Sequence, residues 1–148
     1  MHESLILATL TAALTLPAFA TEDVIATRKA LMSGNAASAG LAGAMLKQEV
    51  AYSPAAGRAV LSSFNATAMA FGDYFPEGSD TGDTKARETI WSDRAGFEAE
   101  LAKFRTAASE GAAAGGREGP PDLAAFQAAV VPVLDTCRSC HEGYQVSD

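Results

Sequence analysis

The stretch "PPDLAAFQAAVVPVLDTCRSCHEGYQ", Pro120 to Gln145, decides how this chain folds. Apolar residues recur in it every three or four positions, which predicts an amphipathic helix. They are Leu123, Phe126, Val130, Val133 and Cys137. Two prolines open the helix, and Pro132 within it predicts a kink because proline removes a backbone hydrogen bond. The two cysteines of the chain, Cys137 and Cys140, lie near its carboxyl end and are followed by His141.

Three other segments have helical spacing, and loops rich in glycine, proline and aspartate separate them. The first runs from Val24 to Leu46. The second begins with Ser53 and Pro54, an N-cap residue followed by a proline in the first helical turn. The third is predicted to start near Thr84. With the last helix, these segments predict an all-α fold, an antiparallel four-helix bundle in one domain.

The first twenty residues differ from the rest of the chain. Leu5 to Leu16 is an uncharged apolar run, and Ala18 to Ala20 has the small residues of a cleavage site. This pattern is typical of a secretory signal peptide and is too short to span a membrane; a buried amino-terminal helix is the alternative. We therefore expect a cleaved signal peptide at residues 1–20 and a mature domain at residues 21–148. That domain is expected in the periplasm, without membrane insertion.

The cysteine pair is compatible with several chemistries. A thioredoxin-like dithiol needs a cysteine at a helix amino terminus in a βαβ setting, whereas this pair follows a long helical segment. A zinc site needs about four ligands, and the only other histidine, His2, lies in the predicted signal peptide. A disulfide between Cys137 and Cys140 would close a very small loop and leaves His141 without a role.

Covalent haem attachment accounts for all three residues. Cys137 and Cys140 lie one helical turn apart, so both sulfurs can form thioethers on one edge of a porphyrin. His141 follows at once and can ligate the iron. Cys-x-x-Cys-His is the attachment signature of c-type haem, and we therefore predict one covalently bound haem c.

A Cys-x-x-Cys-His in the last helix of a four-helix bundle resembles the class II c-type cytochromes, the cytochrome c′ and cytochrome c-556/c-554 group. "DVIATRKALM" (Asp23–Met32) is similar to the start of that family's first helix. "YFPEGSDTGDTKARETIWSDRAGFEAEL" (Tyr74–Leu101) is similar to its loop and third helix, and "CRSCHEGY" (Cys137–Tyr144) to its end. The resemblance implies that Cys137 and Cys140 bind the haem and that His141 is the proximal iron ligand.

Members of this family differ in what faces the iron opposite the histidine. In the cytochrome c′ group an apolar side chain covers that face, and the five-coordinate iron binds nitric oxide or carbon monoxide. In the c-556/c-554 group a methionine of the first helix is the sixth ligand. Met32 occupies the corresponding place, four residues after Arg28. We predict that Met32 ligates the iron of a low-spin electron carrier that is not an enzyme. The five-coordinate form, with Met32 as a cover or as core filler, is the alternative.

The resemblance also implies contacts from Arg28 and Lys85 to the haem propionates. Gln145 departs from it, because cytochromes c′ usually carry Arg or Lys four residues after the haem histidine. The net charge of −7 argues against nucleic acid as a partner and predicts redox partners with a basic docking face. Both a monomer and a homodimer are compatible with the family. A helical module without haem, closed by a disulfide, is a third possibility and predicts a protein without visible absorption.

Overall fold

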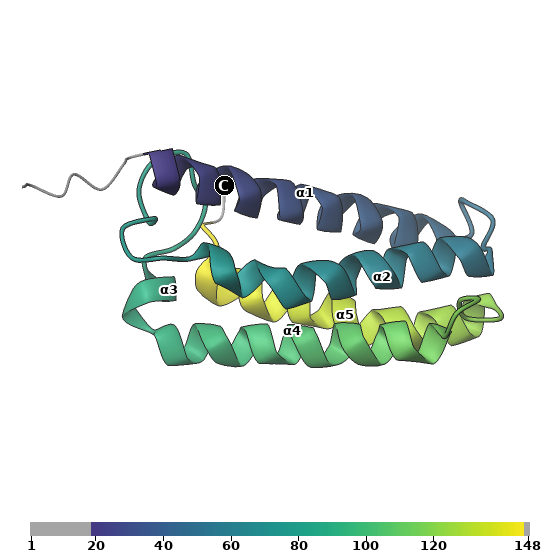
Figure 1. Cartoon of the computed structure of the whole chain (residues 1–148). Coiled ribbons are helices and arrows are strands. Elements are labelled where there is room, and N and C mark those ends of the chain that lie inside the picture. The colour runs from purple at the N-terminus through teal and green to yellow at the C-terminus, as the bar shows by residue number, and fades with distance from the viewer. Residues whose placement is uncertain (1–18, 147–148) are drawn as a thin grey trace, which may run out of the picture.

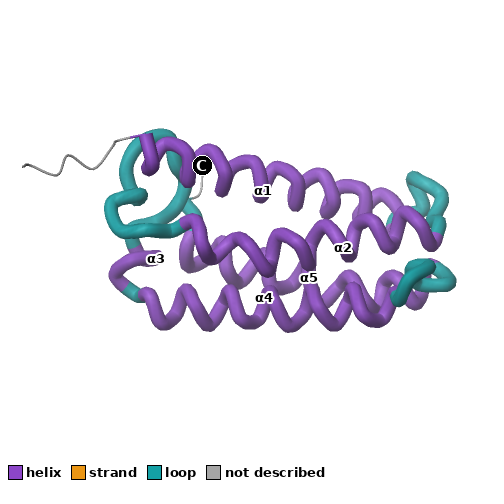
Figure 2. Tube along the Cα trace, viewed as in Figure 1, coloured by secondary structure: helices purple, strands orange, loops and turns teal. Residues whose placement is uncertain are grey.

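The structure is a computed structural model that describes residues 19–146, with side chains from Val24 onwards. Four long helices run in alternating directions along the bundle, and loops gather at its two ends (Figures 1 and 2). The elements are α1 (Phe19–Leu46), α2 (Pro54–Ala70), the 3₁₀ turn η1 (Phe71–Tyr74), α3 (Thr89–Ser92), α4 (Arg94–Gly115) and α5 (Leu123–Tyr144). The predicted antiparallel four-helix bundle is confirmed. The predicted signal peptide lies almost entirely outside the described residues and stays a prediction.

Side-chain caps explain where α2 and α5 begin. Ser53 Oγ accepts a hydrogen bond from Ala56 N at 3.2 Å, and Pro54 occupies the first turn of α2, as predicted. Asp122 Oδ1 accepts one from Ala125 N at 2.8 Å at the start of α5. These caps satisfy backbone donors that have no partner within the helix.

The predicted start of the third helix near Thr84 is wrong. The chain there pairs with the end of α5, since Arg87 N donates to Tyr144 O at 3.1 Å and Val146 N donates to Lys85 O at 2.9 Å. The backbone of this segment therefore forms hydrogen bonds with the end of α5 instead of a helix of its own. Only the single helical turn α3 follows it. The long helix α4 begins at Arg94, where Asp93 Oδ1 accepts a hydrogen bond from Gly96 N.

The helices do not pack equally against one another. Helix α4 packs closely against α2 and α5, and α1 packs mainly on α2 and contacts α5 much less. One apolar cluster fills the middle of the bundle, and a second, smaller one lies at the end that holds α3. The larger side chains of the first are Met45, Val60, Leu61, Phe64, Phe104, Phe126, Val130 and Val133. The second consists of Phe75, Ile90, Phe97 and Leu101.

Helix α5 continues through Pro132 as one element, and the kink expected there stays a prediction. Within the part of the chain that the structure describes, no helix is both long and apolar enough to cross a membrane.

Candidate functional site

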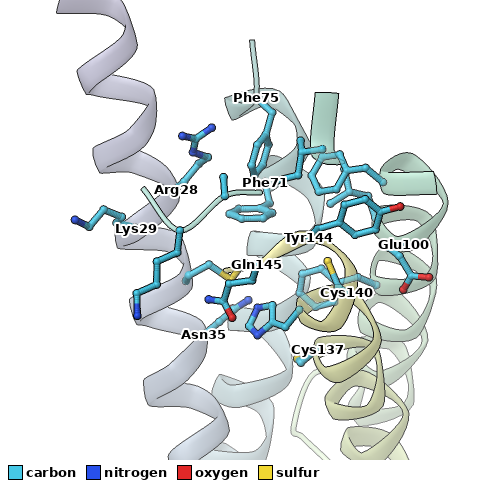
Figure 3. A pocket seen from close by; sticks show the side chains of 18 of the residues that line it. Arg28, Lys29, Asn35, Phe71, Phe75, Glu100, Cys137, Cys140, Tyr144 and Gln145 are labelled. Carbon is cyan, nitrogen blue, oxygen red and sulfur yellow. The ribbon is translucent and has the colours of Figure 1, made fainter. Parts of the chain in front are cut away.

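A cavity of about 530 Å³ lies where α1 separates from α5. Side chains of α1, α4 and α5 form its walls, and the loop before α3 closes one end (Figure 3). Most of its surface is apolar. The large apolar side chains that line it are Phe71, Phe75, Ile90, Phe97, Leu101 and Phe104. The cavity therefore borders both apolar clusters and offers an apolar space for a large flat group.

Helix α5 brings the three residues of the attachment motif to this cavity. Cys137, Cys140 and His141 all line it, because residues three and four positions apart share one face of a helix. Both cysteines are unpaired thiols in the last turns of the helix. They come from the carboxyl-terminal part of α5, so the helix dipole does not favour a thiolate there.

Burial sets the protonation of these groups. It raises the pKa of both thiols, that of Cys140 to about 11, where the charges of Glu100 and Cys137 add to the effect. Burial also lowers the pKa of His141. The imidazole is therefore neutral at pH 7, which is the form that ligates a metal.

Helix α1 forms the opposite wall and contributes Met32, Asn35, Ala36 and Ala39. Met32 is half-buried and lines the same cavity as His141, as a distal ligand or a cover requires. Whether it ligates stays a prediction. Asn35 is only 7 % exposed, and its Oδ1 has no hydrogen-bond partner. Asn35 was not among the predicted site residues.

Arg28 lines the cavity at its loop end and is only 4 % exposed. Its guanidinium donates to Ser79 O at 2.8 Å and Ser79 Oγ at 3.1 Å, and to Tyr74 O and Thr84 Oγ1 at 3.3 Å. Its guanidinium carbon also lies 4.7 Å from the centre of the Phe75 ring. The side chain thus fastens the loop after η1 to α1. Its predicted propionate contact stays a prediction.

Lys85 lines the same end of the cavity, together with Lys29 and Asp83, which form an ion pair. The structure therefore brings the predicted propionate-binding residues, Arg28 and Lys85, to one end of the cavity. The propionate contact of Lys85 also stays a prediction.

Two arginines near His141 escaped the sequence analysis. Arg87 and Arg138 line a second hollow that also includes His141 and Gln145. The guanidinium of Arg87 donates to Glu142 O at 3.1 Å, which fixes it against the end of α5. Gln145 lacks the charge common in cytochromes c′, but a cation from another segment lies close by. No local pattern in the sequence brings Arg87 to this place.

The donor set fits a covalently attached haem. Two thiols and a neutral imidazole lie on one wall, apolar side chains surround the space, and cations lie at one end for two carboxylates. A bare metal ion fits less well, because residues 19–146 contain no group of three or more His, Cys, Asp or Glu side chains placed to bind one.

Residues 23–145 match the family described as Cytochrome C′. The chain belongs to this family. It is 38 % identical over 148 residues to a cytochrome c′ of Cereibacter sphaeroides, covering 95 % of this chain and 96 % of that protein. It is also 30 % identical to a cytochrome c-556 of Rhodopseudomonas palustris, over 85 % of each chain. The solved structure of Rhodopseudomonas palustris cytochrome c′ superposes with a TM-score of 0.76 at 31 % identity, covering 85 % of this chain and 98 % of that one.

The predicted membership in the class II c-type cytochromes is therefore confirmed. The cofactor of the family is covalently bound haem c, and the cofactor prediction is confirmed with it. The relatives of the chain include proteins named cytochrome c′ and others named cytochrome c-556. The name of the family does not by itself assign the sixth coordination position.

Proposed function

We propose that this chain is a periplasmic haem protein of the cytochrome c′ type, in which His141 holds the iron and a small diatomic gas binds on the opposite face. The observation that supports it best is the wall of α1, where Met32 is half-buried and Ala36 and Ala39 follow it. These small side chains and the loose α1–α5 contact leave space opposite His141. Similarity to cytochromes c′ also supports the proposal.

When bound, the haem supplies a one-electron couple and an iron with a coordination position for the gas. The chain supplies the rest. Cys137 and Cys140 would hold the group as thioethers, and the neutral imidazole of His141 would ligate the metal. Aromatic side chains such as Phe71 and Phe97 keep water away from it. We propose binding or electron exchange, rather than turnover of a substrate, as the role of the protein.

The electron carrier predicted from the sequence is the second candidate. One specific observation favours it: the Met32 side chain, a soft sulfur donor, lines the same cavity as His141. The similarity to cytochrome c-556 agrees with it. In that case the Met32 sulfur occupies the sixth position, and the protein exchanges electrons without binding gas.

The visible spectrum of the reduced protein, before and after carbon monoxide is added, separates the two candidates. The proposal predicts a broad high-spin spectrum that changes at once with the gas. A sharp low-spin α band that does not change when carbon monoxide is added would instead support the electron carrier. Met32→Ala should then convert the low-spin form to a gas-binding one. Met69→Ala is the matched control, because Met69 is 61 % exposed on α2 and does not line the cavity.

For its redox partners we retain the proposal of a basic docking face. The chain carries a net charge of −7, which attracts positively charged surfaces over long distances. The rate of electron exchange with a basic partner should fall as ionic strength rises. Between about 10 mM and about 500 mM salt the Debye length falls from about 30 Å to less than 8 Å. A rate of electron exchange that stays the same over this range would contradict the proposal.

A further inference from the structure

The carboxyl end of α5 has its hydrogen-bond partners in another part of the chain. The last carbonyls of an α-helix have no donor within the helix and need one from elsewhere. Here the guanidinium of Arg87 donates to Glu142 O at 3.1 Å, and the backbone N of Arg87 donates to Tyr144 O at 3.1 Å. Between them, Thr89 Oγ1 donates to Gly143 O at 2.9 Å. Two residues of one short segment therefore satisfy the last three carbonyls of this helix.

The segment that supplies these donors is itself held in place. Thr89 is the first residue of α3, which lies at the end of the bundle where α5 ends (Figure 1). Ile90, the next residue, is only 2 % exposed and belongs to the second apolar cluster. The indole of Trp91 donates to Pro76 O at 3.0 Å. Helix α3 is therefore a firm support for the end of α5.

The supported turn carries the residues of the attachment motif. His141 directly precedes Glu142, and His141 O accepts a hydrogen bond from Gln145 N at 3.2 Å. With the three bonds from Arg87 and Thr89, each of the last four carbonyls of α5 is paired. Helix ends fray when their terminal groups lack partners, and the direction of a side chain follows from its backbone. The three bonds therefore restrict where the imidazole of His141 can point.

We propose that Thr89 and Arg87 are positioning residues for the haem iron: they hold the last turn of α5 and so fix the orientation of the His141 imidazole. The inference rests on the proposed role of His141 as the iron ligand, and it applies to both candidate functions, since each has His141 on the iron. Groups beyond the ligands of a metal orient those ligands in this way. Thr89 is the better residue to test, because it is uncharged, whereas the cationic Arg87 lines a hollow together with His141.

Two measurements on the oxidised, haem-loaded protein test this role. His141 is the only histidine in residues 21–148, so isotope labelling of histidine isolates its ring signals in the NMR spectrum of the mature chain. The unpaired electrons of ferric iron shift these signals by an amount that depends on the orientation of the ring. Thr89→Val keeps the shape of the side chain but removes its donor, so it should displace or double the His141 signals. Amide hydrogen exchange at Gln145 should become about fivefold faster, as expected for one lost hydrogen bond.

Other variants of the same short helix serve as controls. Thr89→Ser keeps a hydroxyl group and should restore both the His141 signals and the slow exchange. Ser92→Ala is the matched control, because it also removes a hydroxyl from α3, but Ser92 Oγ donates to Glu88 O at 3.3 Å and not to α5. It should leave both measurements unchanged. If Thr89→Val prevents haem incorporation, Thr89→Ala gives the same readouts with a smaller side chain.

Two results would overturn the inference, and they differ. His141 signals that are the same in the wild type, Thr89→Val and Thr89→Ala refute the positioning role even where exchange at Gln145 is faster, because the hydrogen bond then stabilises only the helix end. That result leaves the proposed function intact. A wild-type protein whose His141 signals carry no shift from the iron refutes His141 as the ligand, and with it both the proposed function and this inference.

Discussion

Replacing Arg28 tests how the loop end of the cavity is held. Arg28→Met keeps the length and the apolar stem of the side chain but removes every donor. The two shorter hydrogen bonds, to Ser79 O and Ser79 Oγ, come from a charged group and contribute about 1.5 to 3 kcal/mol each. The two at 3.3 Å add little. The cation–π contact with Phe75 adds about 0.5 to 1 kcal/mol.

These contributions overlap, so we expect Arg28→Met to lower the free energy of unfolding by about 4 kcal/mol. Arg28→Lys should lose about half as much, because an ammonium group cannot reach both oxygens of Ser79 in the way a planar guanidinium does. A loss of this size is a large part of the stability of a small domain, which is about 5 to 15 kcal/mol.

Urea unfolding of the haem-loaded protein, followed by circular dichroism, measures this loss. Hydrogen exchange at the amides of Ser79 and Thr84, both in backbone hydrogen bonds within the loop, reports whether the loop is released. Arg58→Met is the control, since Arg58 is exposed on α2. A loss below about 1 kcal/mol for Arg28→Met, with unchanged loop protection, would refute the assignment of Arg28 as a clamp.

Two further predictions concern other parts of the chain. In the haem-free protein Cys140 should react with iodoacetamide about tenfold more slowly at pH 8 than an ordinary thiol, because its pKa is raised from 9.0 to about 11. The reactive thiolate is about 100-fold scarcer, but a thiolate of higher pKa is several-fold more nucleophilic, which offsets part of the loss. The rate of Cys140 should rise with pH up to about 11, and Glu100→Gln should increase it at pH 8; a plateau near pH 9 would contradict the raised pKa. Gly119→Ala should destabilise the bundle by more than about 2 kcal/mol in thermal unfolding, because Gly119 has φ +94° and an added Cβ would lie 1.9 Å from Pro54 O. Gly116→Ala is the comparison, since Gly116 also has a positive φ of +55° but its added Cβ would meet no atom within 4 Å. This variant should therefore be destabilised only by the strained backbone conformation, and by less than Gly119→Ala.

Local sequence patterns predicted the parts of this molecule that depend on neighbouring residues. Ser53 and Pro54 mark the start of α2, and the spacing of Cys137, Cys140 and His141 puts all three on one face of α5. Each of these features is decided within one or two helical turns, by capping or by helical periodicity. That is why the bundle and the attachment motif were accessible without a structure.

Features that depend on contacts between distant segments were not accessible in the same way. Thr84 looked like a helix start, but its segment pairs with the end of α5, and α4 starts ten residues later at Arg94. The family resemblance gave Arg28 only a contact to a haem propionate, and the structure adds its four hydrogen bonds to the loop. At Thr84, tertiary contacts override the local helix propensity. At Arg28, they give the side chain hydrogen-bond partners that no local pattern predicts.

The cavity itself follows from an uneven distribution of large side chains along the bundle. Helices α2, α4 and α5 meet through large side chains such as Phe64, Phe104 and Phe126, which are buried in the middle of the bundle. On α1 the wall that faces α5 has Ala36 and Ala39 instead, so the two helices stay apart and the cavity borders both apolar clusters. A cavity of about 530 Å³ with apolar walls leaves apolar side chains in contact with water until a ligand covers them, which is unfavourable. A covalently bound haem would fill this space between the two clusters, and the thioether bonds predicted for Cys137 and Cys140 would make it a permanent part of the core.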